Sequence, residues 1–219
     1  MNSKREELPT YSRSEEIFNM SSHIIGGIMG IVEIILCIVL QNSGYGLLSG
    51  IIFGISLFIL YAMSSTYHGL NPKDIKLKSL FRIFDHCSIF ILIAGSYTPF
   101  ILCILREYNF KLGWTFYAVI WFIALVGIIL NAIDMKKFKI FSMVCYLVMG
   151  WSIITRIDVI MKALGTTGFY LLLSGGLAYT IGFIFYAIGK KKKWMHSIFH
   201  ILCIIGSILH IICILKYVI

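Results

Sequence analysis

Residues 194–217 read WMHSIFHILCIIGSILHIICILKY, an apolar run that contains one lysine, Lys216, and three histidines. A helix of this length is sufficient to cross the roughly 30 Å of hydrocarbon in a bilayer. His196 and His200 are four residues apart, so they lie on one face of such a helix, about 6 Å from each other. Because imidazoles are costly inside a membrane, this pair predicts polar partners on neighbouring helices.

The composition is typical of an integral membrane protein. Hydrophobic residues make up 59% of the 219 residues and charged residues only 13%, whereas a soluble domain is about a quarter charged. All six cysteines lie in apolar stretches without a C-x-x-C pair, which favours buried thiols over disulfides or a thiolate metal site. We expect no cleavable signal peptide, because residues 1–16 are polar and the first apolar run is too long.

Seven apolar stretches are each long enough to span a membrane. The sequence therefore predicts an all-α fold, a seven-transmembrane helix bundle over residues 17–219, preceded by a cytoplasmic polar tail over residues 1–16. The predicted spans are Ile17–Leu40, Gly46–His68, Leu80–Leu105, Leu112–Ile133, Phe141–Met161, Phe169–Ile188 and Trp194–Tyr217.

The lysines and arginines predict the orientation of these spans. With a cytoplasmic N-terminus, fourteen of the nineteen basic residues lie inside and five outside, as the positive-inside rule requires. This arrangement predicts an outward C-terminus and a location in the cell membrane. It also explains the net charge of +9 as loop charge, so we expect membrane lipids as partners and no nucleic acid. No feature of the sequence fixes the oligomeric state.

Small residues predict where the helices approach one another. Gly46, Gly50 and Gly54 recur every four residues in the second span, and Gly26 and Gly30 do so in the first. Such ridges let neighbouring helices pack closely. In the third span, Pro99 should kink or locally loosen the helix.

Polar residues of three spans meet on the cytoplasmic side if the spans alternate in direction. The second span ends there with Ser64 and His68, and the third begins there with Asp85. The seventh begins there with His196 and His200. Three neutral histidines with an open fourth position form a known catalytic zinc arrangement. We therefore predict a Zn²⁺ site made by the three histidines.

Asp85 and Ser64 are the candidate catalytic residues beside this site. Asp85 could orient and deprotonate the attacking water, could be a fourth ligand, or could pair with Arg82 one helical turn away. Ser64 could bind substrate or water, or only its own helix backbone. His86 lies about 100° around the helix from Asp85, so we expect it to face elsewhere. His210 is fourteen residues from His196, about 21 Å along the helix, so it should not share the metal.

A second polar set lies on the first span. Glu16, Asn19 and His23 share one helix face, and we favour a polar network that joins this helix to its neighbours. The sequence assigns no functional role to these three residues, and Glu33 further along the span has no partner that the sequence identifies.

These residues carry a family resemblance. Ser64-x-x-x-His68, Asp85 and His196-x-x-x-His200 resemble the haemolysin III family, which is related to the progestin and adipoQ receptors and to the alkaline ceramidases. Supporting motifs are Glu16-x-x-Asn19-x-x-x-His23, Ala94-Gly95-Ser96-Tyr97-Thr98-Pro99 and Gly175-Gly176-x-x-Tyr179-Thr180-x-Gly182. The short tail and loops are similar to those of bacterial members.

The resemblance implies a zinc ion held by the histidines at positions 68, 196 and 200, with Asp85 near the activated water. The wider superfamily is regarded as membrane hydrolases, some of which cleave lipid amides. Three functions follow as hypotheses: a zinc-dependent hydrolase of lipid amides or esters, a receptor-like membrane-homeostasis protein with a structural metal, and a cytolysin or pore. The pore is the least favoured, because the fourth and fifth spans carry almost no ionisable residues at depth.

Overall fold

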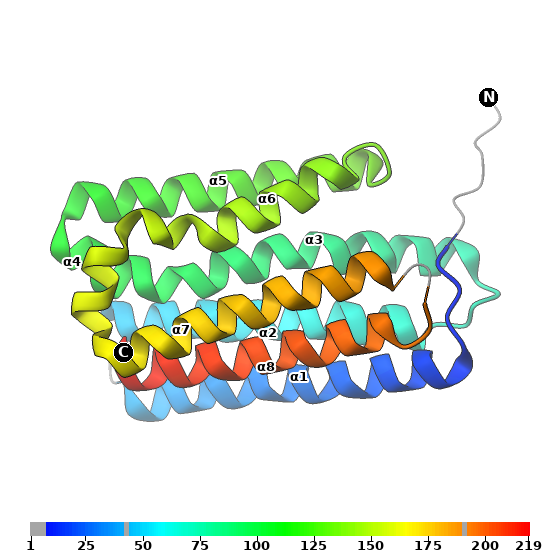
Figure 1. Cartoon of the computed structure of the whole chain (residues 1–219), viewed down its shortest axis with the longest axis horizontal. Coiled ribbons are helices and arrows are strands. Elements are labelled where there is room, and N and C mark those ends of the chain that lie inside the picture. Colours follow the sequence, from blue (N-terminus) through cyan, green and yellow to red (C-terminus); the bar gives the residue numbers. More distant parts are fainter. Residues whose placement is uncertain (1–7, 42–43, 190–191) are drawn as a thin grey trace.

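The computed structural model describes residues 8–41, 44–189 and 192–219, and all regular structure within these ranges is helical. The long helices run along a common axis, and α1 begins at the end of the bundle opposite to the one where α8 finishes (Figure 1). In chain order the elements are α1 (Arg13–Leu40), α2 (Gly44–Gly69), α3 (Ile75–Phe100), the π-helix η1 (Ile101–Leu105), α4 (Arg106–Tyr108), α5 (Phe110–Asp134), α6 (Lys139–Trp151), the 3₁₀-helix η2 (Ser152–Arg156), α7 (Ile157–Ile188) and α8 (Met195–Tyr217).

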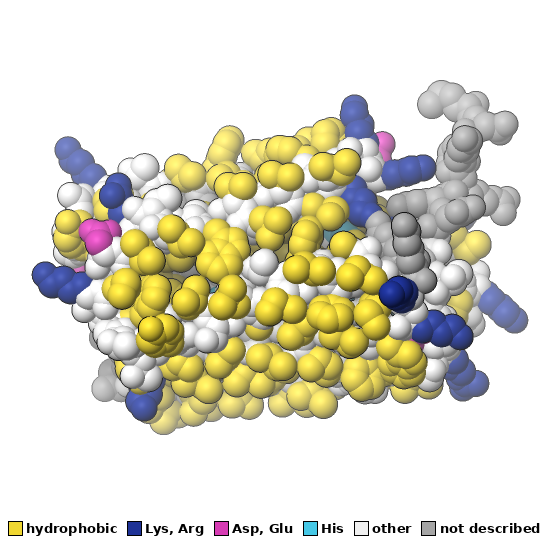
Figure 2. Space-filling model, viewed as in Figure 1, with side chains coloured by type: hydrophobic (Ala, Val, Ile, Leu, Met, Phe, Trp, Pro, Cys, Tyr) yellow, Lys and Arg dark blue, Asp and Glu magenta, His cyan; other side chains and the backbone are white. Residues whose placement is uncertain are grey.

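The surface of the bundle is that of a protein surrounded by lipid. Hydrophobic side chains cover the middle of the face in Figure 2, and lysines and arginines gather at its two ends. Within the described ranges, six helical segments are long and apolar enough to cross a membrane. The chain is therefore a multi-pass membrane protein, as its composition predicted.

One of these six segments, Lys139–Ile188, contains both the predicted fifth and the predicted sixth span. Its helical hydrogen bonding passes from α6 through η2 into α7, but Gly165 has φ 63° and ψ −178°. Glycine adopts this backbone conformation at little cost, unlike residues with a side chain. The break lies between the two predicted spans, and Figure 1 shows the chain reversing direction between α6 and the later part of α7.

Glycines bring α1 and α2 together as predicted. A Cβ atom added to Gly30 would lie 2.8 Å from the backbone nitrogen of Phe58 and 2.9 Å from the carbonyl oxygen of Gly54. Only a residue without a side chain permits this approach. The contact fixes α1 beside the helix that carries His68.

The predicted effect of Pro99 is also confirmed. Proline lacks an N–H group and interrupts the hydrogen bonding of an α-helix, and α3 changes into the π-helical turn η1 two residues later. The apolar core is centred here, where Phe90, Ile101 and Leu105 are completely buried. The polar site described next lies away from this core, where α2 ends and where α3 and α8 begin.

Candidate metal centre

Three buried histidines converge where α2 ends and α8 begins. The Nε2 atom of His196 lies 3.4 Å from Nε2 of His68 and 3.0 Å from Nε2 of His200. One ligand atom from each ring can be chosen so that all three lie within 4.8 Å of one another. The structure thus brings together the histidines that the sequence placed at one depth.

The spacing of these nitrogens fits a metal ion. Two ligands of a tetrahedral zinc site, each about 2.0–2.1 Å from the metal, are roughly 3.3 Å apart. The two Nε2–Nε2 separations from His196, 3.0 and 3.4 Å, bracket this value. A neutral imidazole has only one N–H group, so three converging Nε2 atoms cannot all satisfy one another by hydrogen bonds. The donor set therefore suits a cation that prefers nitrogen ligands.

Glu16 orients the first of these rings from the neighbouring helix. Its Oε2 atom lies 2.5 Å from Nδ1 of His68, and its Oε1 atom accepts a hydrogen bond of 2.5 Å from Nζ of Lys78. Because Nδ1–H donates to the carboxylate, the lone pair of Nε2 is left facing the other two histidines. Lys78 is only 2% exposed, so this ion pair also ties α1 to α3.

Other polar residues of α1 are only partly satisfied. The ring of His23 stacks on that of His200, with centroids 3.6 Å apart and an interplanar angle of 17°. Among the described residues, neither ring nitrogen of His23 nor the side-chain amide of Asn19 has a hydrogen-bond partner. The predicted network thus forms through Glu16 only. Further along α1, the thiol of Cys37 donates to Glu33, at 3.0 Å.

Asp85 lines a small cavity next to His196. The cavity has a volume of about 20 Å³, enough for roughly one water molecule. The carboxylate does not belong to the three-histidine group found among the described residues, but Asp85 and His196 both line the cavity. The full lining comprises Pro9, Tyr11, Tyr67, Arg82, Asp85, His86, Tyr186 and His196.

The prediction that the His86 side chain faces away from Asp85 is wrong. Its Nδ1 atom lies 2.9 Å from the carbonyl oxygen of Arg82 and 3.7 Å from Oδ2 of Asp85, while Nε2 lies 3.1 Å from the hydroxyl of Tyr186. The ring bends back along its own helix toward α7, so an angle measured at the backbone did not predict its position. His86 therefore shares the cavity with Asp85.

Tyr11 covers the centre from the segment before α1. Its ring stacks on that of His196 with centroids 4.8 Å apart and an interplanar angle of 22°, and it lies 5.7 Å from the ring of His68. Burial raises the pKa of the Tyr11 hydroxyl, so this group is neutral at physiological pH. Ser64 is buried on α2, one turn before His68.

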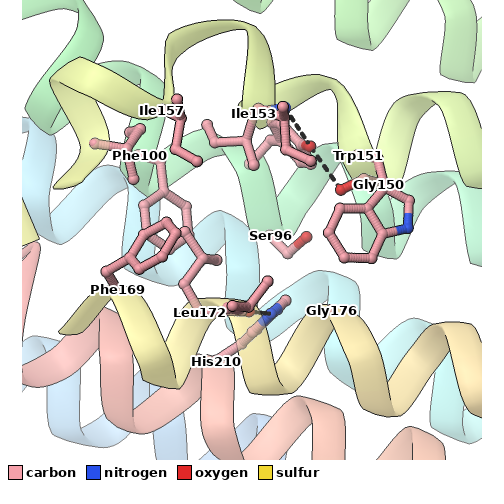
Figure 3. Close-up of a pocket in the computed structure, with 14 residues that line it drawn as sticks. Ser96, Phe100, Gly150, Trp151, Ile153, Ile157, Phe169, Leu172, Gly176 and His210 are labelled. Carbon is pink, nitrogen blue, oxygen red and sulfur yellow. Dashed lines mark hydrogen bonds between the residues drawn. The ribbon is translucent and has the colours of Figure 1, made fainter. Parts of the chain in front are cut away.

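A larger cavity, of about 90 Å³, lies away from the three histidines. Figure 3 shows its lining of mainly apolar side chains from α3, α6, η2, α7 and α8. His210 is part of this lining, and its Nε2 atom donates to the carbonyl oxygen of Leu172 over 3.2 Å. As predicted, His210 is not a member of the three-histidine group in the described part of the chain.

Comparison with known proteins identifies the family. A family profile described as "Haemolysin-III related" matches residues 11–211, which is most of the chain. The chain belongs to the haemolysin III family. This haemolysin III protein is 39% identical over 209 residues to Hemolysin-3 of Bacillus cereus, covering 94% of this chain and 92% of that relative. It is 36% identical over 210 residues to the Hemolysin-3 homolog of Bacillus subtilis (strain 168), and this match covers 94% of this chain and 96% of that relative.

A more distant similarity extends to animals. The human monocyte to macrophage differentiation factor is 28% identical over 172 residues, covering 76% of the haemolysin III chain and 68% of the human protein. These matches confirm the family resemblance that the histidine and aspartate motifs indicated.

Two contributors to the site were missed by the sequence analysis. Lys78 was counted with the cytoplasmic loop charges, and nothing in its local sequence separates it from Lys76 or Lys73. Tyr11 lies in the part of the chain that was treated as a polar tail. The only available signal was Glu16 itself, because a buried charge in a membrane requires a partner, and the sequence did not identify which residue that partner is.

Proposed function

We propose that this haemolysin III protein is a zinc-dependent hydrolase that cleaves an amide or ester bond of a membrane lipid near the cytoplasmic face. One observation carries the proposal. Three buried Nε2 atoms converge at spacings of 3.0 and 3.4 Å, beside a water-sized cavity that Asp85 also lines. Metal ligands next to a carboxylate and a space for water are the components of a hydrolytic site.

The residues divide into distinct roles. His68, His196 and His200 would hold Zn²⁺, with Glu16 fixing the tautomer of His68. A bound zinc ion supplies a Lewis acid that polarises a carbonyl group and makes water nucleophilic at neutral pH. Asp85 accepts the proton of the attacking water in the small cavity and returns it to the leaving group.

Ser64 remains a candidate for a substrate contact. It lies on the face of α2 that carries His68, one turn deeper in the bundle. Its hydroxyl would donate to the carbonyl oxygen of the substrate, a contact that strengthens as negative charge develops there.

We also propose seven membrane crossings, a cytoplasmic N-terminus and an outward C-terminus in the cell membrane. The break at Gly165 and the opposite ends at which α1 begins and α8 finishes support an odd number of crossings. The distribution of lysine and arginine supports the direction. The metal centre then lies toward the cytoplasm, at the depth of the polar and linkage regions of lipids.

A structural metal is the second candidate function. It is favoured by the enclosure of the site, since the three histidines are at most 7% exposed and Tyr11 stacks over His196. A closed site with no access for substrate is typical of structural zinc.

Asp85→Asn separates the two candidates. Purified wild type and variant would be placed in lipid vesicles, and zinc content, lipid cleavage and release of an entrapped dye measured together. For a hydrolase we expect about one zinc per chain in both proteins and cleavage lowered by about 10²–10⁴-fold in the variant. Asp134→Asn, an exposed carboxylate at the same end, is the matched control.

Each other outcome has a distinct meaning. Equal cleavage by both proteins would remove Asp85 from the reaction. Zinc without cleavage in either protein would favour the structural metal, and dye release without cleavage would favour a pore. Zinc retained in a His196→Ala, His200→Ala double variant would refute the metal ligands, whereas His210→Ala should leave zinc content unchanged.

A further inference from the structure

The segment just before α1 lies over the metal centre. In Figure 1 it runs past the start of α8 before α1 begins. Its Tyr11 ring stacks on His196 and approaches His68, as described above. Pro9 and Tyr11 both line the cavity that also contains Asp85. The segment therefore forms one wall of the space next to the candidate catalytic carboxylate.

The anchoring of this segment changes at Ser12. The Ser12 side chain accepts a hydrogen bond from the backbone nitrogen of Glu15 and closes a capping box at the start of α1. Glu15 in turn accepts a hydrogen bond of 2.6 Å from the backbone nitrogen of Trp194. From Ser12 onward the chain is thus fixed to both α1 and α8. Residues 8–12 precede the helix. The side chain of Tyr11 contacts the site through its ring, which packs on the rings of His196 and His68.

With the segment in this position, the site is too small for the substrate that the proposed function requires. A cavity of about 20 Å³ accepts roughly one water molecule, not an amide or ester group with its substituents. The histidines themselves are buried. A substrate can reach them only after part of the wall has moved.

We propose that Tyr11 is a movable cover that closes the metal centre on its cytoplasmic side, and that displacement of residues 9–11 admits the polar linkage region of a lipid. This proposal rests on the proposed hydrolase function for its ligand, and on ring contacts and cavity geometry for the cover itself. Movement of Tyr11 would expose Asp85, Arg82 and the hydroxyls of Tyr67 and Tyr186, which line the same cavity. Such charged and hydroxyl groups match a lipid headgroup and linkage region better than they match an acyl chain.

The cover can be tested without metal or turnover. Tyr186→Cys introduces a thiol into the cavity wall, and its reaction with a small charged methanethiosulfonate reagent reports access from water. In lipid nanodiscs we expect the reaction to become about two- to tenfold faster when Tyr11→Ala is added, the range expected for loss of one ring stack. Tyr11→Phe keeps the ring and should keep the slow rate. Thr10→Ala changes an exposed neighbour and should also stay slow.

Equal rates with and without Tyr11→Ala would overturn the proposal, and so would a fast rate for Tyr11→Phe. Continued slow reaction of Cys37 and Cys213, both completely buried, would show that the variant remains folded. If Tyr11→Ala does not fold, Pro9→Gly loosens the same segment and should accelerate the reaction in the same way. An unchanged rate in folded Pro9→Gly would then count against the cover.

A second measurement links the cover to the metal. Removal of zinc by a water-soluble chelator should be accelerated in Tyr11→Ala by a factor similar to that for the thiol, with the same zinc content before the chelator is added. A protein that binds no zinc would refute the proposed function, while the thiol reaction would still decide whether Tyr11 covers the site. Zinc that is bound and leaves both proteins equally fast would refute the cover and leave the metal site in place.

Discussion

Replacing Glu16 by Gln tests whether the contact between α1 and His68 belongs to the metal centre or only to helix packing. The substitution keeps the shape of the side chain and removes its charge. Glutamine can still accept from Nδ1 of His68, but it no longer provides the carboxylate that makes the imidazole a stronger ligand. We expect Glu16→Gln to bind zinc about 10–100-fold more weakly, which corresponds to roughly 1.4–2.7 kcal/mol.

The same substitution also affects folding, through Lys78. This ammonium group is 2% exposed and lies 2.5 Å from Glu16 Oε1. Removing one partner of a buried ion pair costs about 3–5 kcal/mol, because the remaining charge is uncompensated. Adding Lys78→Met removes that charge, so the double variant should recover much of the lost stability. It should not recover zinc affinity, since His68 still lacks its carboxylate.

The assay is a competition titration against a chromophoric chelator, with thermal unfolding of the same samples. Glu107→Gln, an exposed carboxylate beyond η1, serves as the control and should match wild type in both measurements. Wild-type zinc affinity in the folded Glu16→Gln, Lys78→Met double variant would refute the reasoning. Glu16 would then act through packing alone.

Two further predictions concern the bundle. Reporter fusions after Asn71 and Lys192 should behave as cytoplasmic and a fusion after Asn109 as external, because the basic residues then lie inside; an external signal at Asn71 with a cytoplasmic one at Lys192 would contradict the shared site. Gly30→Ala should destabilise the protein by about 1–3 kcal/mol, because the added Cβ would meet Phe58 and Gly54 of α2. Gly150→Ala is the control: it has open space around its Cβ and should unfold at the wild-type temperature. Both variants would be compared with wild type by thermal unfolding in detergent.

The convergence of His68, His196 and His200 could be predicted because depth in a membrane protein follows from span order. A residue near the end of a span has a known depth once the direction of the chain is known. The i, i+4 spacing then places the last two histidines on one helix face. Both arguments use only local geometry and topology, and the structure brings the three rings together.

The partners of these histidines could not be derived in the same way. Which helices are neighbours decides whether Glu16 meets His68, and a single sequence does not contain that information. Lys78 looks like its exposed neighbours because its burial depends on a carboxylate from another helix. His86 was misplaced because a long side chain can bend along the helix away from the direction of its Cβ atom. The break at Gly165 lies in the gap predicted between the fifth and sixth spans. The helical segment that continues through this gap, from Lys139 to Ile188, was not predicted.

The positions of the three histidines along the chain have a consequence for biosynthesis. His68 and His196 are separated by 128 residues, and a ribosome adds about 5–20 residues per second. Roughly 6–25 s therefore pass between the synthesis of the first ligand and that of the second. During this interval the membrane holds a nascent chain in which Glu16 and Lys78 can already fix His68, while no complete binding site exists. Capture of the proposed zinc ion would thus be confined to the final stage of insertion, because a chain released before α8 lacks two of the three histidines.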